Sequence, residues 1–441
     1  MQALKLPLYL LRNDKAGLKR HIAEHVTIDP RGLPYREELV AWLRGERARG
    51  RRIVLATASD ARYAEAVAAH LDLFDDVLAS DGHTNLKGTV KLQAILDHAH
   101  CADLSYAGND TVDLAIWARA QGAVVVSSSA RLARRAGQLT TVEKSFRPPT
   151  VGLRDLLYGI RLHQWLKNLL VFLPVLPILS QATPGMLAEL LAAFMAFGLA
   201  ASSTYVVNDL LDLESDRQHH RKRNRPFASG RIGVPGALAL AGALLVSAAL
   251  FAKWLAPAFW VVLVSYVGLT LLYSLMLKRR VLVDVFALAA LYTLRILGGA
   301  AAIQVLPSLW ILAFSAFTFL SLALVKRYVE LAEKSSAEGL VNSARGYLVS
   351  DLGFVQGVGI ASGQVSALVL SLYVNDPLMA KRYAHPYVLW LIVPLYLYWI
   401  SRMWLKAFRV ELHCDPVVFA ARNRISRLVF LLCSLALLAA V

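Results

Sequence analysis

The chain has 441 residues and a formal net charge of +16, and 57% of its residues are hydrophobic. The length allows two domains, and the three cysteines, Cys101, Cys414 and Cys433, are too far apart to indicate a disulfide framework or a cysteine metal site. Much of the positive charge stands in short loops between apolar runs, as in proteins that face anionic lipid, so we expect no nucleic-acid partner.

Residues 1–145 are mixed in composition, and between 35 and 137 they alternate between helical and strand patterns. The apolar stretch at 4–11 is too short for a signal peptide. Such alternation is typical of an α/β domain with a parallel sheet, in which ligands bind at the carboxyl ends of the strands. We predict helices at 37–49, 61–71 and 90–98 and strands at 52–56, 77–79, 104–107 and 123–126, with another helix between the last two strands.

Side chains suited to phosphate chemistry follow two of these strands. Thr57 to Asp60 come after the strand at 52–56, and Gly108 to Asp113 come after the strand at 104–107. In these residues the region resembles the haloacid-dehalogenase-type phosphatases. The resemblance implies phosphoryl binding by Thr57, with Ser59 as the alternative, charge stabilisation by Lys91 rather than Lys87, and Mg²⁺ binding by Asp110 and Asp113.

The same region departs from that family at its nucleophile. The family carries its nucleophilic aspartate and a partner aspartate in a DxDx(T/V) motif on the first strand, and this chain contains no such motif. Asn109 also stands where many relatives keep an acid. Because a covalent aspartyl-phosphate cannot form without the nucleophile, we expect an incomplete domain that is inactive as a phosphatase. A purely structural α/β module explains the pattern equally well.

From residue 150 to 441 the chain consists of apolar runs separated by basic loops. Each run approaches the ~20 residues that a membrane-spanning helix needs, so we predict an all-α polytopic bundle of nine transmembrane helices. Lys and Arg gather in alternate loops, while the opposite loops offer only Lys253, Lys381 and Arg382, which places the N-terminal region on the cytoplasmic side of the inner membrane. The runs are 166–181, 187–211, 236–254, 257–277, 281–302, 307–325, 355–374, 386–404 and 426–441.

An acidic motif ends the second run. Asn208, Asp209, Asp212 and Asp216 recur every three or four residues, which on one helix forms a single stripe. Carboxylates at membrane depth are costly unless they hold something cationic, and hard oxygen ligands suit Mg²⁺ shared with substrate phosphates. The motif therefore indicates a Mg²⁺-pyrophosphate site that faces the cytoplasm. Three cations nearby are candidates for binding the outer phosphate oxygens: Arg217, Lys222 and Arg225.

Further polar groups occur inside or beside the other apolar runs. An arginine deep inside a span indicates function, whereas Trp and Lys at a span's entrance also serve as interfacial anchors. Asp284 and Arg295 share one helix face in the fifth run, with Tyr292 close to it. The remaining candidates are Gln164, Lys167 and Asn168 at the entrance of the first run, Lys326 and Arg327 at the end of the sixth, and Asp415 before the last.

Residues 150–441 resemble the UbiA-type intramembrane prenyltransferase superfamily in the spacing Asn208-Asp209-x-x-Asp212-x-x-x-Asp216. Members that act on aromatic acceptors carry a second DxxxD motif. Here Asp284 matches its first aspartate, but Leu288 stands at the position of the second. Four short segments look more like the decaprenyl-phosphate phosphoribosyltransferase branch. They are Gln164-Trp165-x-Lys167-Asn168, Leu294-Arg295-x-x-Gly298-Gly299, Lys326-Arg327-Tyr328 and His413-x-Asp415-Pro416-Val417-Val418-Phe419.

The resemblance implies phosphoribosyl pyrophosphate as donor and a polyprenyl phosphate as acceptor. Asp209, Asp212 and Asp216 would hold Mg²⁺-pyrophosphate, and Asn208 would orient it. Asp284 would bind a metal or the ribose hydroxyls, and Lys167, Lys326 and Arg327 are candidates for the 5-phosphate or the lipid phosphate. The alternatives are prenyl transfer to a small acceptor, or a transporter or lipid-binding protein. Transporters usually show repeat symmetry or broken helices near the midplane instead.

Overall fold

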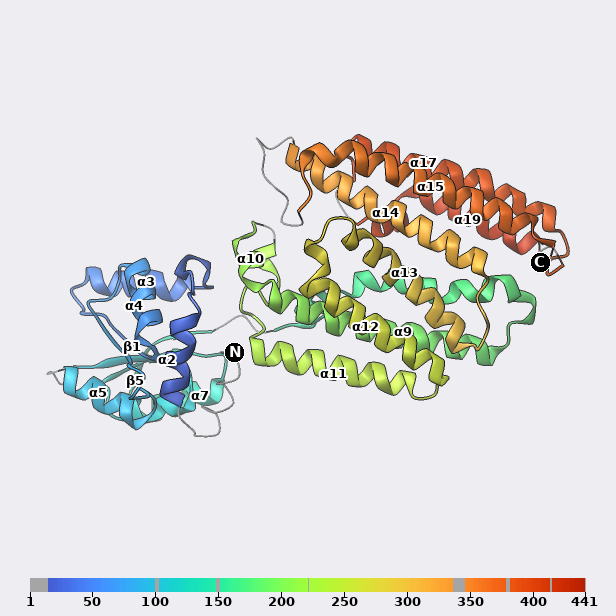
Figure 1. The fold of residues 1–441 in the computed structure, drawn as a ribbon. Helices are drawn as coiled ribbons and strands as arrows, with labels where there is room; N and C mark the ends of the chain where they lie inside the picture. Colours follow the sequence, from blue (N-terminus) through green and yellow to red (C-terminus); the bar gives the residue numbers. More distant parts are fainter. Residues whose placement is uncertain are drawn as a thin grey trace. The chain divides into compact units, whose positions relative to one another are not determined.

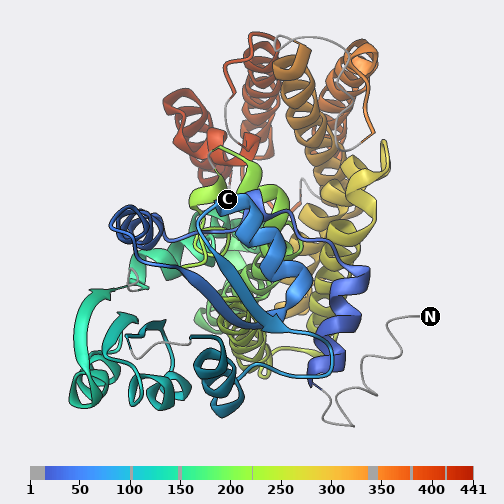
Figure 2. The same cartoon turned by 90° about the vertical axis from the view of Figure 1, so that its left-hand side faces the viewer.

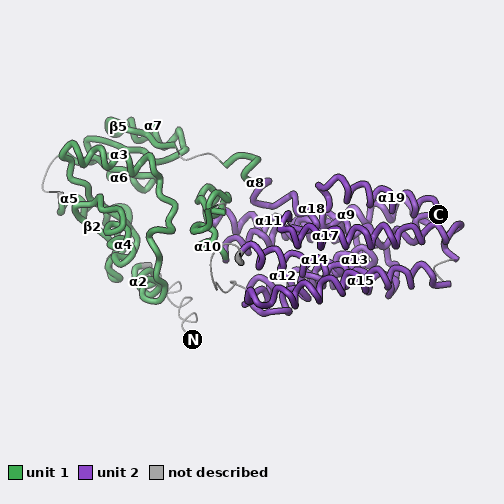
Figure 3. The backbone as a smooth tube through the Cα atoms, turned by 90° about the horizontal axis from the view of Figure 1, so that it is seen from above, with its two compact units in different colours: residues 1–156, 212–233 green, residues 157–211, 234–441 purple. Residues whose placement is uncertain are grey.

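The computed structural model describes residues 15–99, 103–147, 151–220, 222–335, 346–377, 381–412 and 415–440, so Cys101, Cys414, His413 and the stretch at 4–11 lie outside the described residues. The chain forms two compact units (Figure 3). Unit 1 comprises Met1–Leu156 and Asp212–Gly233, and unit 2 comprises Leu157–Leu211 and Val234–Val441.

Unit 1 contains the expected α/β arrangement, with parallel strands and helices packed against them (Figure 1, Figure 2). The strands form two sheets in the described residues, β1-β2 and β3-β4-β5, where the pattern predicted one. The strands are β1 (Val54–Asp60), β2 (Asp76–Ser80), β3 (Ser105–Gly108), β4 (Gly122–Val126) and β5 (Thr141–Phe146). The helices are α2 (Lys15–His25), η2 (Pro30–Gly32), α3 (Glu37–Ala48), α4 (Ala61–Leu71), α5 (Thr89–Ala99), η3 (Thr111–Asp113), α6 (Leu114–Trp117), α7 (Ala130–Leu139), α10 (Leu213–Gln218) and η5 (Lys222–Asn224).

Local capping explains why these elements begin where they do. The Asp60 side chain accepts a hydrogen bond from the Arg62 amide at the start of α4, and the Ser129 hydroxyl accepts one from Leu132 at the start of α7. Behind the strands, Trp117 is fully buried and its indole donates to the Tyr106 carbonyl oxygen at 2.9 Å. Apolar side chains of α5, α6 and α7 complete one core around this tryptophan.

Unit 2 is a bundle of long apolar helices, eight of which are long enough to cross a membrane in the described residues. A bent pair, α18 and α19, makes the ninth candidate, with an 80° angle between its two helices. These helices occur at the nine predicted runs. They are η4 (Leu162–Gln181), α9 (Pro184–Leu211), α11 (Val234–Ala252), α12 (Pro257–Leu275), α13 (Val283–Ala302), α14 (Leu309–Ser335), α15 (Leu352–Asn375), η8 (Pro386–Leu391) with α17 (Ile392–Phe408), α18 (Pro416–Arg422) and α19 (Arg424–Ala440).

Three short helical turns, η6 (Leu277–Arg279), η7 (Val349–Asp351) and α8 (Leu153–Gly159), complete the described elements. The first span, η4, is a 3₁₀ helix. Pro174 and Pro177 stand inside it, and a proline lacks the amide that a regular α-helical ladder needs. Its irregular backbone packs directly against α13.

Helix α13 joins the two apolar cores of the bundle. Val285, Tyr292 and Ile296 face a core shared with α14, α15 and α17, which lie side by side in Figure 1. Leu291 and Ala302 face the second core, shared with η4, α9 and α12. The approach of η4 to α13 is so close that a Cβ at Gly299 would overlap the Val171 carbonyl oxygen. Only glycine permits this contact, which lies close to the hydrogen bond between Arg295 of α13 and Asn168 of η4.

Candidate active site

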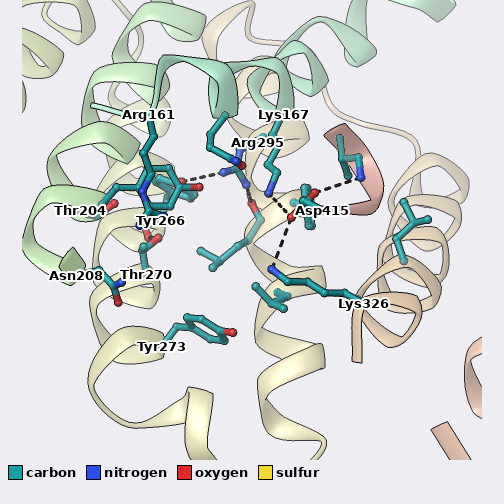
Figure 4. Close-up of a pocket in the computed structure, with 18 of the residues that line it drawn as sticks. Arg161, Lys167, Thr204, Asn208, Tyr266, Thr270, Tyr273, Arg295, Lys326 and Asp415 are labelled. Carbon is teal, nitrogen blue, oxygen red and sulfur yellow. Dashed lines mark hydrogen bonds and ion pairs between the residues drawn. The ribbon is translucent and has the colours of Figure 1, made fainter. Parts of the chain in front are cut away.

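A cavity of about 260 Å³ opens among the helices of unit 2 (Figure 4). Its walls combine cationic, hydroxyl-bearing and apolar side chains from η4, α9, α12, α13 and α14, together with the residues that begin α18. Seven residues predicted from the sequence line it. They are Gln164, Lys167, Asn208, Tyr292, Arg295, Lys326 and Asp415.

Two lysines share one carboxylate at one side of the cavity (Figure 4). Lys167 Nζ lies 2.7 Å and Lys326 Nζ 3.7 Å from the same oxygen, Oδ2, of Asp415. The other oxygen of Asp415 accepts a hydrogen bond from the Val417 amide and so caps α18. Two ammonium groups against one carboxylate leave a net positive charge, which favours a phosphate at this wall.

Arg295 forms a rigid part of the cavity wall. It is buried, and its three nitrogens donate to Asn168 Oδ1 at 2.8 Å, to the Leu291 carbonyl at 2.6 Å and to Tyr266 Oη at 2.8 Å. The guanidinium carbon also lies 4.8 Å from the centre of the Tyr266 ring, within the range of a cation–π contact. Asn168 is therefore a support for Arg295, and it does not itself line the cavity.

The sequence interpretation missed a stripe of hydroxyl groups on α12. Tyr266, Thr270, Tyr273 and Ser274 follow one another at helical spacing and all line the cavity. The signal was present as polar positions at i, i+4, i+7 and i+8 inside an otherwise apolar span. Thr204 and Tyr205 on α9 add further hydroxyl groups to the same space.

Arg161 was also missed. It lines the cavity, forms an ion pair with Asp209, and its guanidinium lies 5.0 Å from the centre of the Tyr205 ring. Its backbone has a positive φ of 52°, an unusual conformation for a residue with a side chain. The sequence signal was its position three residues before Gln164, in a segment already selected for its polar entrance.

The acidic motif does not lie on one continuous helix. Helix α9 ends at Leu211, Asp212 has backbone angles of −94° and 11°, and α10 begins at Leu213. The predicted single stripe from Asn208 to Asp216 is therefore wrong at Asp212, where the apolar run of α9 ends. Asn208 and Asp209 belong to unit 2, whereas Asp212 and Asp216 belong to unit 1.

Within unit 1, Asp216 is nearly buried and lies beside two of the predicted cations. Arg225 Nη1 is 2.6 Å from Asp216 Oδ2, and Lys222 Nζ is 3.7 Å from Oδ1. Arg217 instead donates to the Ala228 carbonyl at 3.2 Å. Buried carboxylates are stable only beside cations, and Asp209 and Asp216 each have a basic neighbour. Carboxylate and amide oxygens are hard donors of the kind that Mg²⁺ prefers.

Asp284 and Arg327 lie apart from the cavity lining. Asp284 is completely buried, and its carboxylate accepts hydrogen bonds from Arg327 Nε at 2.6 Å and from Tyr347 Oη at 2.7 Å. Arg327 also pairs with Glu330. The neighbouring residues Lys326 and Arg327 therefore point to different surroundings, one to the cavity and the other to α13.

The predicted phosphatase residues of unit 1 are held by local contacts. Asp113 accepts hydrogen bonds from the amides of Asn109 and Asp110 at 2.9 and 3.0 Å and from Tyr106 Oη at 3.1 Å. Lys91 donates to Tyr106 Oη at 3.2 Å, and burial lowers the pKa of Lys91, opposed by the negative charge of Asp113. Asp113 thus stabilises the loop that follows β3.

Other candidates of unit 1 also make short-range contacts. The Asp110 carboxylate accepts a hydrogen bond from the Thr111 hydroxyl at 3.0 Å, and Thr57 accepts one from the Ser59 amide at 3.1 Å. Thr57 and Ser59 stand within β1, whereas the prediction placed them after the strand. The Asp110 contact closes the turn that follows β3.

An apolar groove of about 220 Å³ lies next to the cavity, and Lys167 and Val417 line both. The groove runs along η4 and faces α14 and α18. Its other lining residues are Leu166, Leu169, Leu170, Phe172, Leu173, Leu176 and Phe319. A cationic group thus stands where a polar cavity meets an apolar groove.

Comparison with family models gives two matches. Residues 171–420 match the UbiA prenyltransferase family, and residues 8–114 match the haloacid dehalogenase-like hydrolases. Among solved structures, a UbiA homologue from Archaeoglobus fulgidus bound to GPP and Mg²⁺ is 15% identical at a TM-score of 0.47, covering 65% of this chain and 98% of that one.

Three curated proteins are similar in sequence. An uncharacterised protein of Sinorhizobium fredii, y4nM, is 36% identical over 418 residues, which cover 93% of this chain and 80% of that protein. The nodulation protein NoeC of Azorhizobium caulinodans is 36% identical over 266 residues, or 60% and 85% of the two chains. The decaprenyl-phosphate phosphoribosyltransferase of Mycobacterium tuberculosis is 34% identical over 214 residues, or 47% and 70%.

Proposed function

Because the chain belongs to the UbiA prenyltransferase family, we propose that it moves 5-phosphoribose from phosphoribosyl pyrophosphate to a polyprenyl phosphate and releases pyrophosphate. The family match and the N-terminal haloacid-dehalogenase-like match confirm both resemblances drawn from the sequence. The chain is a multi-pass membrane transferase. The observation that carries the finer proposal is a hydroxyl-lined, cationic cavity that joins an apolar groove at Lys167.

The lining of the cavity supports a sugar donor. Hydroxyl groups of α9 and α12 and the buried guanidinium of Arg295 surround a space suited to a molecule that carries hydroxyl and phosphate oxygens. A site that offers hydrogen bonds discriminates strongly against a ligand that cannot use them. The hydrocarbon chain of a prenyl donor would make no hydrogen bonds with these polar groups. Partial similarity to decaprenyl-phosphate phosphoribosyltransferases supports the same donor.

The groove supports a lipid acceptor. A polyprenyl phosphate needs an apolar path for its chain and a cation for its headgroup, and both are present where the groove meets Lys167. We assign the acceptor phosphate to Lys167 and Lys326, whose shared carboxylate, Asp415, fixes their positions. Arg295 and the hydroxyl stripe are assigned to the phosphoribosyl group.

The acidic motif is assigned to the leaving group. Asp209, Asp212 and Asp216 are the proposed Mg²⁺ ligands on their donor chemistry, and Asn208, which lines the cavity, is proposed to orient the donor. When bound, Mg²⁺ neutralises charge on the departing pyrophosphate. Arg161 lies beside Asp209, and Lys222 and Arg225 lie beside Asp216; we assign these cations to the outer phosphate oxygens.

The reaction exchanges one bond at the anomeric carbon for another. The bond between this carbon and the pyrophosphate oxygen breaks, and a bond to an oxygen of the lipid phosphate forms. Positive charge develops on the ribose, so the protein contributes mainly alignment and fixed charges. The acceptor phosphate is already anionic, and no side chain has to remove a proton from it. The basic loops support our proposal that this chemistry takes place on the cytoplasmic side of the inner membrane.

A second candidate is prenyl transfer to a small acceptor. The apolar groove favours it, because the groove would also accept the chain of a polyprenyl pyrophosphate. The two candidates differ in which substrate carries the pyrophosphate.

A pyrophosphate-release assay on the purified full chain in detergent with Mg²⁺ separates them. We expect release from phosphoribosyl pyrophosphate that depends on added polyprenyl phosphate, and none from the inactive control Asp212→Asn. Release only from a polyprenyl pyrophosphate with 4-hydroxybenzoate would replace the proposal with the second candidate. Absence of release in both arms, with the protein folded, would reject both.

A further inference from the structure

Asp284 occupies the position from which the family resemblance predicts a second metal site. It begins α13 and is completely buried. Each of its carboxylate oxygens already accepts a hydrogen bond at close range, Oδ2 from Arg327 Nε and Oδ1 from Tyr347 Oη. Mg²⁺ in proteins keeps several waters and needs oxygens that face open space. Neither oxygen of Asp284 meets that condition.

The buried carboxylate of Asp284 also has a cationic partner without a metal ion. Arg327 is 1% exposed and supplies the positive charge that a buried carboxylate requires. One nitrogen of Arg327, Nη2, is buried without a hydrogen-bond partner among the described residues. The open position in this network is therefore a donor, which attracts an anion or a water and repels a cation.

Tyr347 extends the network to the backbone. Its hydroxyl accepts a hydrogen bond from the Leu282 amide at 2.9 Å while it donates to Asp284. Leu282 has a φ of 64° and a ψ of −43°, a strained conformation for a residue with a side chain. Gly346, at a φ of 82°, brings the segment against the carbonyl of Arg279. The network thus binds the start of α13, the residue Arg327 on α14 and the segment before η7.

These contacts bear on the cavity through neighbouring residues. Lys326 precedes Arg327 on α14 and lines the cavity beside Asp415, while Tyr292 and Arg295 line it from α13 (Figure 4). Fixing Arg327 to Asp284 sets the register of α14 against α13. The same register sets where the ammonium group of Lys326 stands relative to Arg295.

We propose that Asp284 is a positioning residue and binds no metal, and that the Arg327 guanidinium takes the place of a second metal ion in this chain. Asp284, Arg327 and Tyr347 form a lock that holds Lys326 of α14 in register with Arg295 of α13. The inference rests on the proposed function only in placing the metal at the motif of Asp209, Asp212 and Asp216. It makes no assumption about the donor.

The test is a Mn²⁺ titration of the full chain in detergent, with free Mn²⁺ followed by electron paramagnetic resonance. The variants are Asp284→Asn, which removes the charge at constant shape, and Tyr347→Phe, which removes one hydroxyl and keeps every charge. Asp212→Asn is the reference for a lost ligand. Amide hydrogen exchange over 280–288 and 346–352 is measured on the same samples.

We expect Asp284→Asn and Tyr347→Phe to bind as many Mn²⁺ ions per chain as the unaltered protein, with a Kd changed by less than about tenfold. Amide exchange should become faster in both segments. The Leu282 amide in particular should exchange faster in Tyr347→Phe, because Tyr347 Oη is its hydrogen-bond acceptor. Asp212→Asn should lose Mn²⁺ without faster exchange in either segment.

Loss of one Mn²⁺ per chain in Asp284→Asn, with exchange unaltered, would overturn the inference. If Asp284→Asn does not fold, Tyr347→Phe decides alone, since unchanged exchange at Leu282 would exclude the lock. These results do not depend on turnover. A failure to release pyrophosphate from the ribosyl donor would reject the proposed function and leave this inference standing, whereas Mn²⁺ binding unaffected by Asp212→Asn would reject only the proposed metal ligands.

Discussion

Arg161 and Asp209 form an ion pair at the wall of the cavity, although 48 residues separate them in sequence. The pair joins the entrance of η4 to the end of α9. It places a cation beside the first carboxylate of the acidic motif, in a chain whose sequence interpretation assigned no role to residue 161.

Replacing Arg161 should impair pyrophosphate release more than folding. Arg161→Ala removes a donor aimed at the leaving group, and loss of one such donor costs about 10²–10³ in rate. Arg161→Lys retains the charge and should recover part of the activity. Steady-state pyrophosphate release measures both, and a thermal melt checks that each variant is folded. If Arg161→Ala and Arg161→Lys both release pyrophosphate as fast as the unaltered protein, Arg161 is not part of the active site.

Asp212→Asn should abolish turnover. The amide retains the shape of the carboxylate but is a poor Mg²⁺ ligand, so the leaving group loses its neutralising charge. Glu214→Gln, a matched change at an exposed residue of α10, should have little effect. Near-normal turnover by Asp212→Asn across a Mg²⁺ titration would contradict the assignment of the acidic motif.

Lys326→Met should raise the KM for the lipid phosphate and leave the KM for phosphoribosyl pyrophosphate close to its original value. The change retains the side-chain length and removes one of two ammonium groups at Asp415, while the pair between Lys167 and Asp415 remains. A charge-assisted contact to phosphate is worth about 1.5–3 kcal/mol, which predicts a change of roughly 10-fold to 150-fold. A selective effect on the KM of the ribosyl donor would reverse the two phosphate assignments.

Tyr273→Phe should have the opposite selectivity. It removes one hydroxyl of the α12 stripe from the cavity lining and retains the ring. If the stripe binds ribose, the KM for phosphoribosyl pyrophosphate rises about tenfold and the KM for the lipid is unaffected. Phe251→Leu, at an exposed apolar position of α11, serves as the control. An unchanged donor KM would show that this hydroxyl does not contact the sugar.

Leu173→Trp should obstruct the apolar groove. The larger ring fills space next to Leu170 and Phe319, so long-chain polyprenyl phosphates should bind more weakly than a short-chain analogue. The comparison of KM values for two chain lengths is internal to one variant and does not depend on its stability. Equal increases for both lengths would place the lipid chain elsewhere.

The sequence predicted elements best where side chains mark their ends. Helix α4 occurs at the predicted 61–71, because Asp60 caps its start and Asp72 adopts the left-handed conformation after its end. The break at Asp212 has no comparable marker, since neither glycine nor proline stands there and the acidic spacing suits one continuous helix. Strand β5 was missed because its alternation is short and mostly exposed.

The candidate site divides in a similar way. Charged residues inside apolar spans, such as Lys167 and Arg295, are costly to bury and were therefore visible in the sequence. Hydroxyl groups give no such signal, because they cost little to bury in a helix. Thr270 donates to the Tyr266 carbonyl within its own helix, an arrangement that any span tolerates. Lys326 and Arg327 are adjacent in sequence but face different surroundings. The direction of Arg327 is decided by its hydrogen bond to Asp284, which lies 43 residues earlier in the chain, so local sequence could not predict it.

The close contact of Gly299 with Val171 sets how near η4 lies to α13. Gly299 stands one turn after Arg295, and Val171 about one turn after Lys167, so this contact adjoins the hydrogen bond from Arg295 to Asn168. A single methyl group at residue 299 would overlap the Val171 carbonyl, force η4 away from α13 and separate Lys167 from Arg295. The spacing of two cations that line the cavity thus depends on one hydrogen atom at a residue outside the lining.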